Sequence, residues 1–370
     1  MNTVTAVAPA RVNIIGEHTD YNEGLVLPTC TALFTRVSAQ RRGDQVVRVR
    51  SSKMGDERVF DVGDIQPDKE GDWIEYVKGV AAGLRDAGVE LAGADLRIDS
   101  NIPLGAGLSS SASLELAVAK ALLGLTVSTM DAREMAFLCQ KAEHEYAGVQ
   151  CGIMDQYALA CAQFGNALML DCRSMDTRHV SIPAELAFFL TDSGVRHSLV
   201  DGEYNKRADE CASAVAVIST SNPDVSSLRD VTDEMLAANE TALGELLFRR
   251  CRHVVSENKR VQEMVAALDG GDLGRVGALL DACHGSLRDD YDVSCTELDT
   301  LARIANDDNR VLGSRMVGAG FGGCVLSACR REDVEEVAAK VRSDYAAASG
   351  EEPLQHIVES AHPARLEETA

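Results

Sequence analysis

One segment of the sequence is apolar almost all the way round a helix. Between residues 112 and 125 the charged residues are Glu115 and Lys120 alone. A helix without a polar face is stable when other elements cover it on every side. The chain therefore has to fold with this segment at its centre, and whatever precedes the helix lies near the core.

The residues directly before this helix form a loop rich in glycine and serine. The loop reads Pro103-Leu104-Gly105-Ala106-Gly107-Leu108-Ser109-Ser110-Ser111. Glycines let a backbone approach an anion closely, and a helix start presents unpaired N–H groups. We predict a phosphate-binding loop, and the alternative is a serine cap after a flexible turn. It is not a Walker A loop, because G-K-[ST] does not occur in the chain.

Composition restricts the partners of the chain. Lys and Arg number 36 and Asp and Glu 58 among 370 residues, so the formal net charge is −22. Such an acidic surface argues against nucleic acid and anionic membranes as partners, and a bound phosphate needs backbone N–H groups, a few cations or a metal. The 11 cysteines include no C-x-x-C pair. Residues 1–9 show no secretory pattern, and no run of 18 apolar residues occurs, so we predict a cytoplasmic protein.

Patterning along the chain mixes strands and helices, which predicts an α+β protein. Thr31–Ala39 has the β-branched, alternating pattern of a strand. Gln45–Arg50 follows the turn residues Gly43-Asp44, which predicts a hairpin with that strand. At roughly 150 residues per domain, the length indicates two domains, which we place at 1–180 and 181–370.

A polar stretch lies between two apolar runs near the N-terminus. It reads Arg11-Val12-Asn13-Ile14-Ile15-Gly16-Glu17-His18-Thr19-Asp20-Tyr21-Asn22-Glu23-Gly24. Carboxylates and imidazole form directed hydrogen bonds with hydroxyl-rich ligands, so the stretch predicts a site for such a ligand. The alternatives are a polar surface turn and, with weaker support, a metal site.

Two further carboxylates have apolar neighbours in the sequence. Asp155 stands in Gly152-Ile153-Met154-Asp155-Gln156-Tyr157 and is either a helix cap or a catalytic group. Glu143 lies beside an apolar helical stripe, where a carboxylate needs a partner such as a metal or an arginine. The alternative for both is a solvated surface position.

A second glycine-rich segment lies near the C-terminus. Val317-Gly318-Ala319-Gly320-Phe321-Gly322-Gly323-Cys324 matches G-x-G-x-x-G. A dinucleotide-binding fingerprint leads into a helix, whereas strand-like residues 324–329 follow here. We therefore reject a dinucleotide site and predict a glycine-rich hairpin that lines a phosphate or a sugar.

These segments, taken together and in this order, resemble the galactokinase family of the GHMP kinase superfamily. Residues 11–28 match its sugar signature, G-R-x-N-[LI]-I-G-E-H-x-D-Y-x-x-G-x-V-L-P, nearly throughout, and residues 104–113 match its phosphate loop. The resemblance implies a two-domain α+β GHMP kinase fold with the active site between the domains. Four further segments resemble the other motifs of the family: residues 73–80, 142–156, 193–207 and 317–324.

The resemblance also implies ATP-dependent phosphorylation of D-galactose at C1, which gives galactose 1-phosphate and ADP in galactose catabolism. Arg11 and Asp155 would flank the C1 hydroxyl as catalytic residues. Arg11 nearby would make Asp155 a weaker base, so Asp155 either accepts the proton late or chiefly orients the hydroxyl. The implied sugar-binding residues are Glu17, His18, Asp20, Gly152 and Tyr204.

ATP and a metal ion are the other ligands that the resemblance implies. Trp73 would lie near the adenine, although it is equally well explained as a core anchor of its amphipathic helix. Ser111 and Glu143 would hold Mg²⁺, and D-galactose and ATP would be the partners of a monomeric enzyme. The implied phosphate-binding residues are Gly105, Ala106, Gly107, Leu108, Ser109, Ser110 and Ser111.

Two departures from the family pattern and two alternative functions qualify this expectation. Ala10 replaces a glycine, so its Cβ is expected to shift Arg11, and Glu75 replaces an asparagine near the expected adenine site. The same-class alternative is a kinase for N-acetylgalactosamine, L-arabinose or galacturonate, although Glu17 near C6 would repel a galacturonate carboxylate. The other alternative is a non-catalytic galactose and ATP sensor, which would have lost the serine loop or Asp155.

Overall fold

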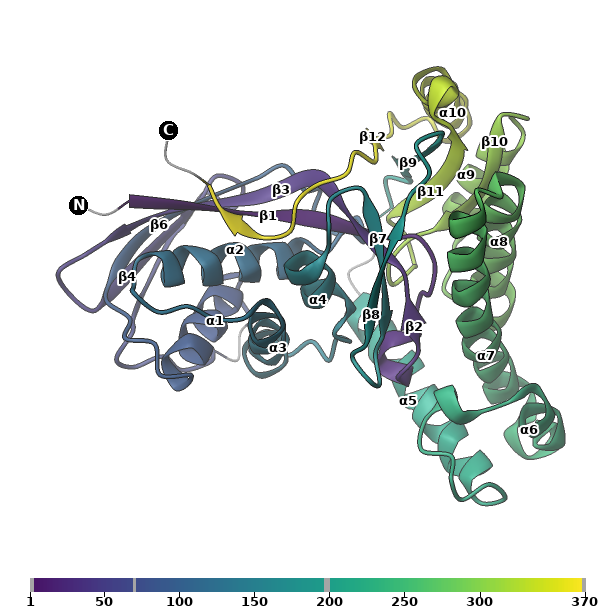
Figure 1. Ribbon diagram of the computed structural model, residues 1–370, viewed down its shortest axis with the longest axis horizontal. Helices are drawn as coiled ribbons and strands as arrows, with labels where there is room; N and C mark the ends of the chain where they lie inside the picture. The colour runs from purple at the N-terminus through teal and green to yellow at the C-terminus, as the bar shows by residue number, and fades with distance from the viewer. Residues whose placement is uncertain (1–2, 69–70, 196–199, 368–370) are drawn as a thin grey trace.

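The computed structural model of the chain, which describes residues 3–68, 71–195 and 200–367, has two groups of elements that lie side by side (Figure 1). Each group is a sheet with helices packed against it. The mixture of strands and helices confirms the α+β class.

The first group is a six-stranded sheet with four helices on one face. The strand order is β13-β1-β3-β6-β4-β5, and α1–α4 lie on the same side of it (Figure 1). The strands are β1 (Thr3–Asn13), β3 (Pro28–Arg41), β4 (Val46–Ser51), β5 (Glu57–Asp61), β6 (Ala94–Ser100) and β13 (Arg365–Leu366). The helices are α1 (Ile74–Asp86), α2 (Ser110–Gly124), α3 (Ala132–Ala142) and α4 (Met154–Cys161).

Helix α2 is the buried helix that its sequence predicts. It packs against β1 and β3 on one side and against α1, α3 and α4 on the others. Its apolar side chains are buried except for the partly buried Leu114, and even the carboxyl-bearing Glu115 is 0% exposed. The segment before α2 is consequently held near the core, as predicted.

The predicted hairpin between Thr31–Ala39 and Gln45–Arg50 is wrong. Strand β6 lies between β3 and β4 in the sheet, pairing with β3 antiparallel and with β4 parallel. The turn groups that a hairpin would use are taken by Gly93, which accepts from Arg42 N and donates to Asp44 O. A local turn signal cannot tell which distant strand will fill the space beside it.

The second group is a four-stranded sheet with the order β10-β11-β9-β12 and a layer of helices. Its strands are β9 (Leu186–Asp192), β10 (Val311–Met316), β11 (Cys324–Arg330) and β12 (Gln355–Ile357). A third sheet, β2 (Leu25–Val26), β7 (Asn166–Asp171) and β8 (Thr177–Ser181), lies near the junction with the first group. The helices are α5 (Val200–Ser219), α6 (Asp233–Ala238), α7 (Glu240–Gly270), α8 (Leu273–Ser286), α9 (Thr296–Asn306) and α10 (Val334–Ser349).

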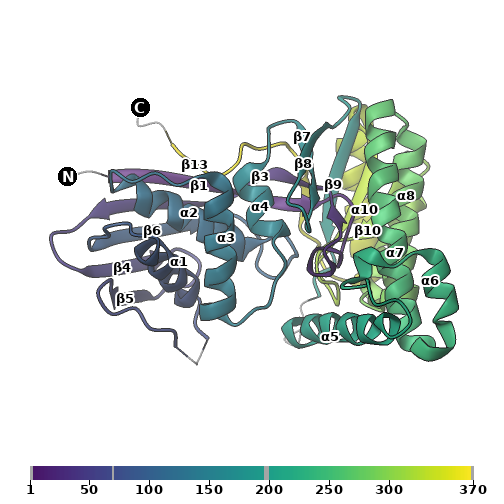
Figure 2. The same cartoon turned by 60° about the horizontal axis from the view of Figure 1, so that its bottom comes forward.

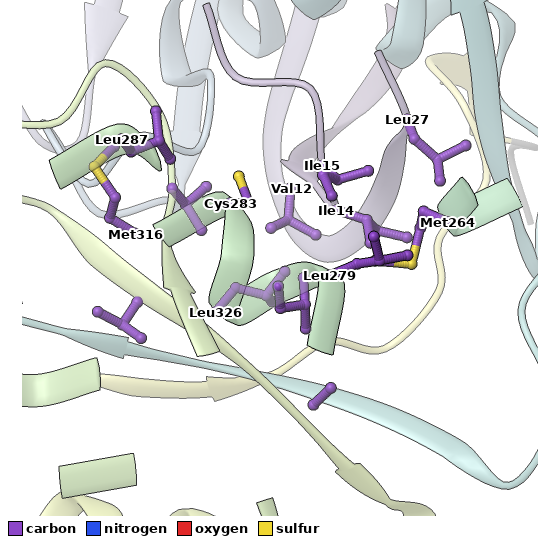
Figure 3. Close-up of a cluster of buried hydrophobic side chains, with 14 of the residues drawn as sticks. Val12, Ile14, Ile15, Leu27, Met264, Leu279, Cys283, Leu287, Met316 and Leu326 are labelled. Atoms are coloured by element: carbon purple, nitrogen blue, oxygen red, sulfur yellow. The ribbon is translucent and has the colours of Figure 1, made fainter. Parts of the chain in front are cut away.

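Both ends of the chain cross between the two groups. After β12 the chain returns to the first sheet, where β13 pairs with β1 (Figure 1). In the other direction, the end of β1 and the loop after it enter the second core, where Val12, Ile14 and Ile15 lie among side chains of α7, α8, β10 and β11 (Figure 3). The division at residue 180 stays a prediction, because both groups contain segments from either side of it. Among the described helices, none is both long enough and apolar enough to span a membrane.

Helix α8 and strand β10 touch backbone to backbone. A Cβ on Gly277 would lie 1.8 Å from the carbonyl oxygen of Leu312, and a Cβ on Gly313 would lie 2.1 Å from that of Gly277. The two glycines therefore allow a contact that no larger residue permits. This contact places the end of β10 and the glycine-rich loop that follows it.

We expect Gly277→Ala to lower the free energy of unfolding by about 1–3 kcal/mol, the range for overpacking a close contact. Urea unfolding followed by circular dichroism measures it. Gly285→Ala in the same helix is the control, because its Cβ would meet no atom within 4 Å, and it should be neutral or slightly stabilising. Equal effects of the two substitutions would show that the close contact does not limit the packing of α8.

Candidate active site

Residues of both groups of elements line a cavity of about 280 Å³. The signature segment (residues 11–28), which begins in β1, and the loop before α2 form two of its walls. Tyr204 of α5 and the glycine-rich loop after β10 close it from the second group. Every predicted site residue except Trp73 lies in its lining. The lining residues are Arg11, Glu17, His18, Asp20, Gly105, Ala106, Gly107, Leu108, Ser109, Ser110, Ser111, Glu143, Val149, Cys151, Gly152, Met154, Asp155, Tyr204, Gly318 and Ala319.

Arg11 and Asp155 form a two-point ion pair in this cavity. Arg11 Nε donates to Asp155 Oδ1 at 2.8 Å, and Arg11 Nη2 donates to Asp155 Oδ2 at 2.9 Å. The Arg11 side chain is 5% exposed and that of Asp155 is 25% exposed. Asp155 is the second residue of α4 and points at Arg11, so it is not a helix cap. Part of the carboxylate remains open to the cavity.

The phosphate-loop candidate is joined to the same pair. Arg11 Nη1 donates to the carbonyl oxygen of Gly107 at 2.5 Å, and Ser109 Oγ donates to Asp155 Oδ2 at 2.5 Å. Ser109 has φ +57° and makes no side-chain cap to α2, which contradicts the reading of the loop as a simple serine cap. Positive φ in a non-glycine residue is strained, and here it directs the hydroxyl to Asp155. Ser110 and Ser111, the first residues of α2, line the cavity.

Glu143 lies where α3 changes its winding. Residues Glu143–Ala147 form a π turn that Gly148 ends with φ +74°, and such turns reorient side chains within helices. The carboxylate of Glu143 accepts from Gln156 Nε2 at 2.6 Å, from Cys151 Sγ at 3.3 Å and from the Ser111 hydroxyl. Burial, and then the negative charge of Asp155, raise the pKa of Glu143 to about 7. The predicted pair of Ser111 and Glu143 is therefore adjacent, and Glu143 is not solvated.

Asp20 and Gly152 fit against each other on the other side of the cavity. A Cβ on residue 152 would lie 1.9 Å from Asp20 Oδ2, so only glycine can occupy this position beside the carboxyl group. Burial, and then Asp155, raise the pKa of Asp20 to about 7. Asp20 can thus present both a hydroxyl donor and acceptor oxygens to a ligand near neutral pH.

Both ring nitrogens of His18 are engaged by protein groups. Nε2 lies 3.1 Å from the carbonyl oxygen of Ala319, so it carries the proton, and Nδ1 accepts from the hydroxyl of Tyr21 at 2.9 Å. Burial lowers the pKa of His18 to about 3, so the ring is neutral. The Tyr204 ring lies 5.7 Å from that of His18, centroid to centroid. Direct contacts of His18 and Tyr204 with a sugar stay predictions.

Trp73 and the two departures from the family pattern lie outside the cavity lining. Trp73 packs against the core of the first group, and its contact with adenine stays a prediction. Glu75 is buried, accepts from the backbone N–H of Asp68 and pairs with Lys78 at 2.6 Å, so it has a structural role. Ala10 is fully buried at an irregularity of β1, and Arg11 reaches Asp155 despite it. Of the segment 193–207, residues 196–199 lie outside the described part of the chain.

Sequence reasoning missed three residues that organise this cavity. Gln156 donates to Glu143, and Cys151 lies beside Gly152 in the lining. Arg315, in β10, donates to Glu17 at 3.0 Å. The available signal for Arg315 was a single charged residue in a strand whose other residues are uncharged, which predicts a buried partner.

The chain matches three family models. They are the galactokinase galactose-binding signature at residues 2–41, the N-terminal domain of GHMP kinases at residues 75–163 and the C-terminal domain of GHMP kinases at residues 264–347. The first two contain the signature segment, the loop before α2 and Asp155. The third ends beyond the glycine-rich loop after β10.

Curated relatives and solved structures agree with these matches. The chain is 45% identical to the galactokinase of Chloroflexus aurantiacus over 96% of this chain and 91% of that protein. It is 40% identical to that of Pasteurella multocida over 94% and 91%. The crystal structure of Lactococcus lactis galactokinase complexed with galactose superposes with a TM-score of 0.92 at 35% identity, covering 98% of this chain and 95% of that one. The Methanococcus jannaschii mevalonate kinase shares the fold, with a TM-score of 0.71 at 18% identity over 98% and 99%. The chain belongs to the galactokinase family of the GHMP kinases, which are ATP-dependent enzymes.

Proposed function

We propose that this protein transfers the γ-phosphoryl group of ATP to the C1 hydroxyl of D-galactose. The observation that carries the proposal is the joining of the Arg11–Asp155 pair to the phosphate-loop candidate by Ser109 and Gly107. This arrangement places a cation, a carboxylate and a helix N-terminus within one cavity. The 45% identity to a curated galactokinase over 96% of this chain supports the same assignment.

Different residues of the cavity would have different roles in such a reaction. Phosphoryl transfer needs positioning and neutralisation of charge more than covalent chemistry. The N–H groups at the start of α2 would bind the phosphates, since a helix N-terminus favours anions. Arg11 would stabilise the negative charge that develops on the transferred group. Its anchoring to Asp155 and Gly107 fixes it before substrate binds.

Asp155 would orient the C1 hydroxyl and accept its proton. Both carboxylate oxygens already accept hydrogen bonds from Arg11 or Ser109, and these bonds hold the carboxylate in one orientation. The hydroxyl becomes more acidic as its oxygen bonds to phosphorus, so its proton would pass to Asp155 as that bond forms. Orientation of the hydroxyl is the part of the role that the geometry supports most directly.

We propose Ser111 and Glu143 as the protein ligands of Mg²⁺. Their oxygens lie side by side, and Arg11 is the one permanent cation among the described lining residues, so a divalent ion fits the surplus of carboxylates. The described residues contain no group of three or more His, Cys, Asp or Glu placed for a metal, and magnesium needs none because it keeps waters and phosphates as ligands. Bound there, the ion supplies charge neutralisation for the phosphates.

The cysteines bear on the cellular compartment of the protein. All 11 cysteines are free, which supports a reducing cytoplasm. The monomeric state also stays a prediction.

The sugar specificity has a direct test. ADP release should depend on D-galactose and exceed that with D-glucose by at least about 100-fold in kcat/KM, because a site that hydrogen-bonds one hydroxyl epimer leaves buried groups unpaired with the other. N-acetylgalactosamine, L-arabinose and galacturonate complete the panel. Phosphorylation of one of these in preference to galactose would overturn the assignment.

We expect Asp155→Asn to lower kcat by about 100-fold or more, the scale of general acid–base catalysis. Galactose affinity, measured by calorimetry, should fall much less than turnover. Asp86→Asn at the exposed end of α1 is the control, since its side chain is 62% exposed. Near-normal turnover of Asp155→Asn would assign the carboxylate a structural role.

Glu143→Gln should raise the Mg²⁺ concentration for half-maximal activity and lower kcat, because it removes one negative ligand. Galactose binding without nucleotide should change little. Glu145→Gln, two residues along the same turn, is the matched control, because its side chain is 57% exposed and pairs with Lys141 at 3.8 Å. An unaltered Mg²⁺ titration in Glu143→Gln would remove it from the proposed ligand set.

A further inference from the structure

Arg315 is a fully buried cation whose guanidinium donates four hydrogen bonds. Its side chain is 0% exposed. Nε donates to the carbonyl oxygen of Ile14 at 2.8 Å, Nη1 donates to that of Met316 at 2.8 Å, and Nη2 donates to the carbonyl oxygen of Asn13. Nη2 also donates to Glu17 Oε1 at 3.0 Å. A buried arginine is costly unless its donors are paired, and here the pairing joins β10 to the signature segment.

Glu17 has little hydrogen-bonding capacity left over. Oε1 accepts from Arg315 and from the backbone N–H of Gly318 at 2.9 Å, while Oε2 accepts from Asn13 Nδ2 at 3.1 Å. Two carboxylate oxygens offer about four acceptor sites, so Oε2 keeps the remaining one. Glu17 also lines the cavity, which leaves Oε2 as the oxygen available to a sugar hydroxyl.

The charge of Glu17 depends on its arginine partners. Burial raises the pKa of Glu17, but Arg315 and then Arg11 lower it, and the net result lies below the usual value. The other titratable groups around the carboxylate are His18, Asp20 and His253, the last through its hydrogen bond to the Glu17 carbonyl.

Arg315 itself faces three further titratable groups from the helices behind it, Glu257, Cys283 and His284. Burial lowers the pKa of His284 below its usual value. Glu257 of α7 and Cys283 of α8 both lie close enough to act on its charge. Glu257 pairs with Arg260 at 2.5 Å and has a pKa of about 2, because Arg260 and His253 outweigh its burial. Glu257 therefore remains ionised from pH 6 to 9, as does Arg315, so neither group titrates in that window.

We propose that Arg315 is a positioning residue for sugar binding: it occupies Oε1 of Glu17, directs Oε2 to the sugar and fixes the Gly318 loop to the same carboxylate. This inference rests on the proposed galactose kinase activity. Arg315 belongs to the second group of elements and would contribute to sugar affinity through Glu17, without touching the sugar.

The test compares Arg315→Met, Arg315→Lys and the control Arg310→Met. Arg310 lies just before the same strand, is 28% exposed and pairs with Asp308 and Glu336. KM for galactose and for ATP, and calorimetric galactose affinity, are measured from pH 6 to 9. Arg315→Met should raise KM for galactose by about tenfold, the loss of one charge-assisted hydrogen bond, with KM for ATP nearly unchanged. Arg310→Met should match the parent protein.

The pH profile separates positioning from a purely structural role. In Arg315→Met, burial is no longer offset by Arg315, so the folded pKa of Glu17 rises and its carboxylate is lost as the pH falls. Galactose affinity should then weaken more toward pH 6 than in the parent protein, whose own profile includes Asp20. Adding Glu17→Gln to Arg315→Met should remove this extra dependence. Arg315→Lys should keep the parent profile, with KM raised about threefold by loss of the arginine fork.

Three outcomes would overturn the inference. They are equal rises of both KM values, a lower melting temperature without any galactose-specific effect, and an extra pH dependence that persists with Glu17→Gln. If Arg315→Met does not fold, the test rests on Arg315→Lys. A rise of KM for galactose relative to KM for ATP in that variant supports the inference, and equal rises overturn it. Galactose binding by the parent protein is measured first, and its absence would reject the proposed function itself.

Discussion

The ion pair of Arg11 and Asp155 holds together the segments from which the cavity is built. Arg11 belongs to β1 and Asp155 to α4, and through Gly107 and Ser109 the pair also fixes the loop before α2. The Arg11 side chain is 5% exposed, and a cation at that depth is costly without a paired carboxylate. The same contacts that stabilise the fold therefore prepare a cation and a carboxylate beside a helix N-terminus.

Two kinds of groups line the rest of the cavity. Backbone N–H groups at the start of α2 suit anions. Asp20 and Glu143 are carboxyl groups whose pKa values burial and Asp155 raise to about 7, and such groups suit hydroxyl groups and a divalent cation. The net charge of −22 does not prevent phosphate binding, because the phosphates would meet local N–H donors and Arg11.

Much of this could be predicted from the sequence, for identifiable reasons. The burial of α2 follows from a helix with no polar face, and the family motifs name most of the residues that line the cavity. The hairpin prediction was wrong because turn residues at 43–44 report local geometry, while β6 takes the place beside β3. The role of Trp73 was ambiguous for the same reason. Helical spacing predicts that Trp73 lies on an apolar face, but the spacing does not say what packs against that face. In the structure α3 and the core of the first group do so.

By itself the sequence determined the local elements, the chemical types at the site and the family. Only the tertiary structure decided which carboxylate is charged and which atoms stay free to bind. Glu17 and Arg315 are 298 positions apart, and the two glycine-rich loops meet where Gly107 touches Val317. Desolvation and hydrogen bonding depend on distances in space, so the state of each buried group is settled when distant segments pack together.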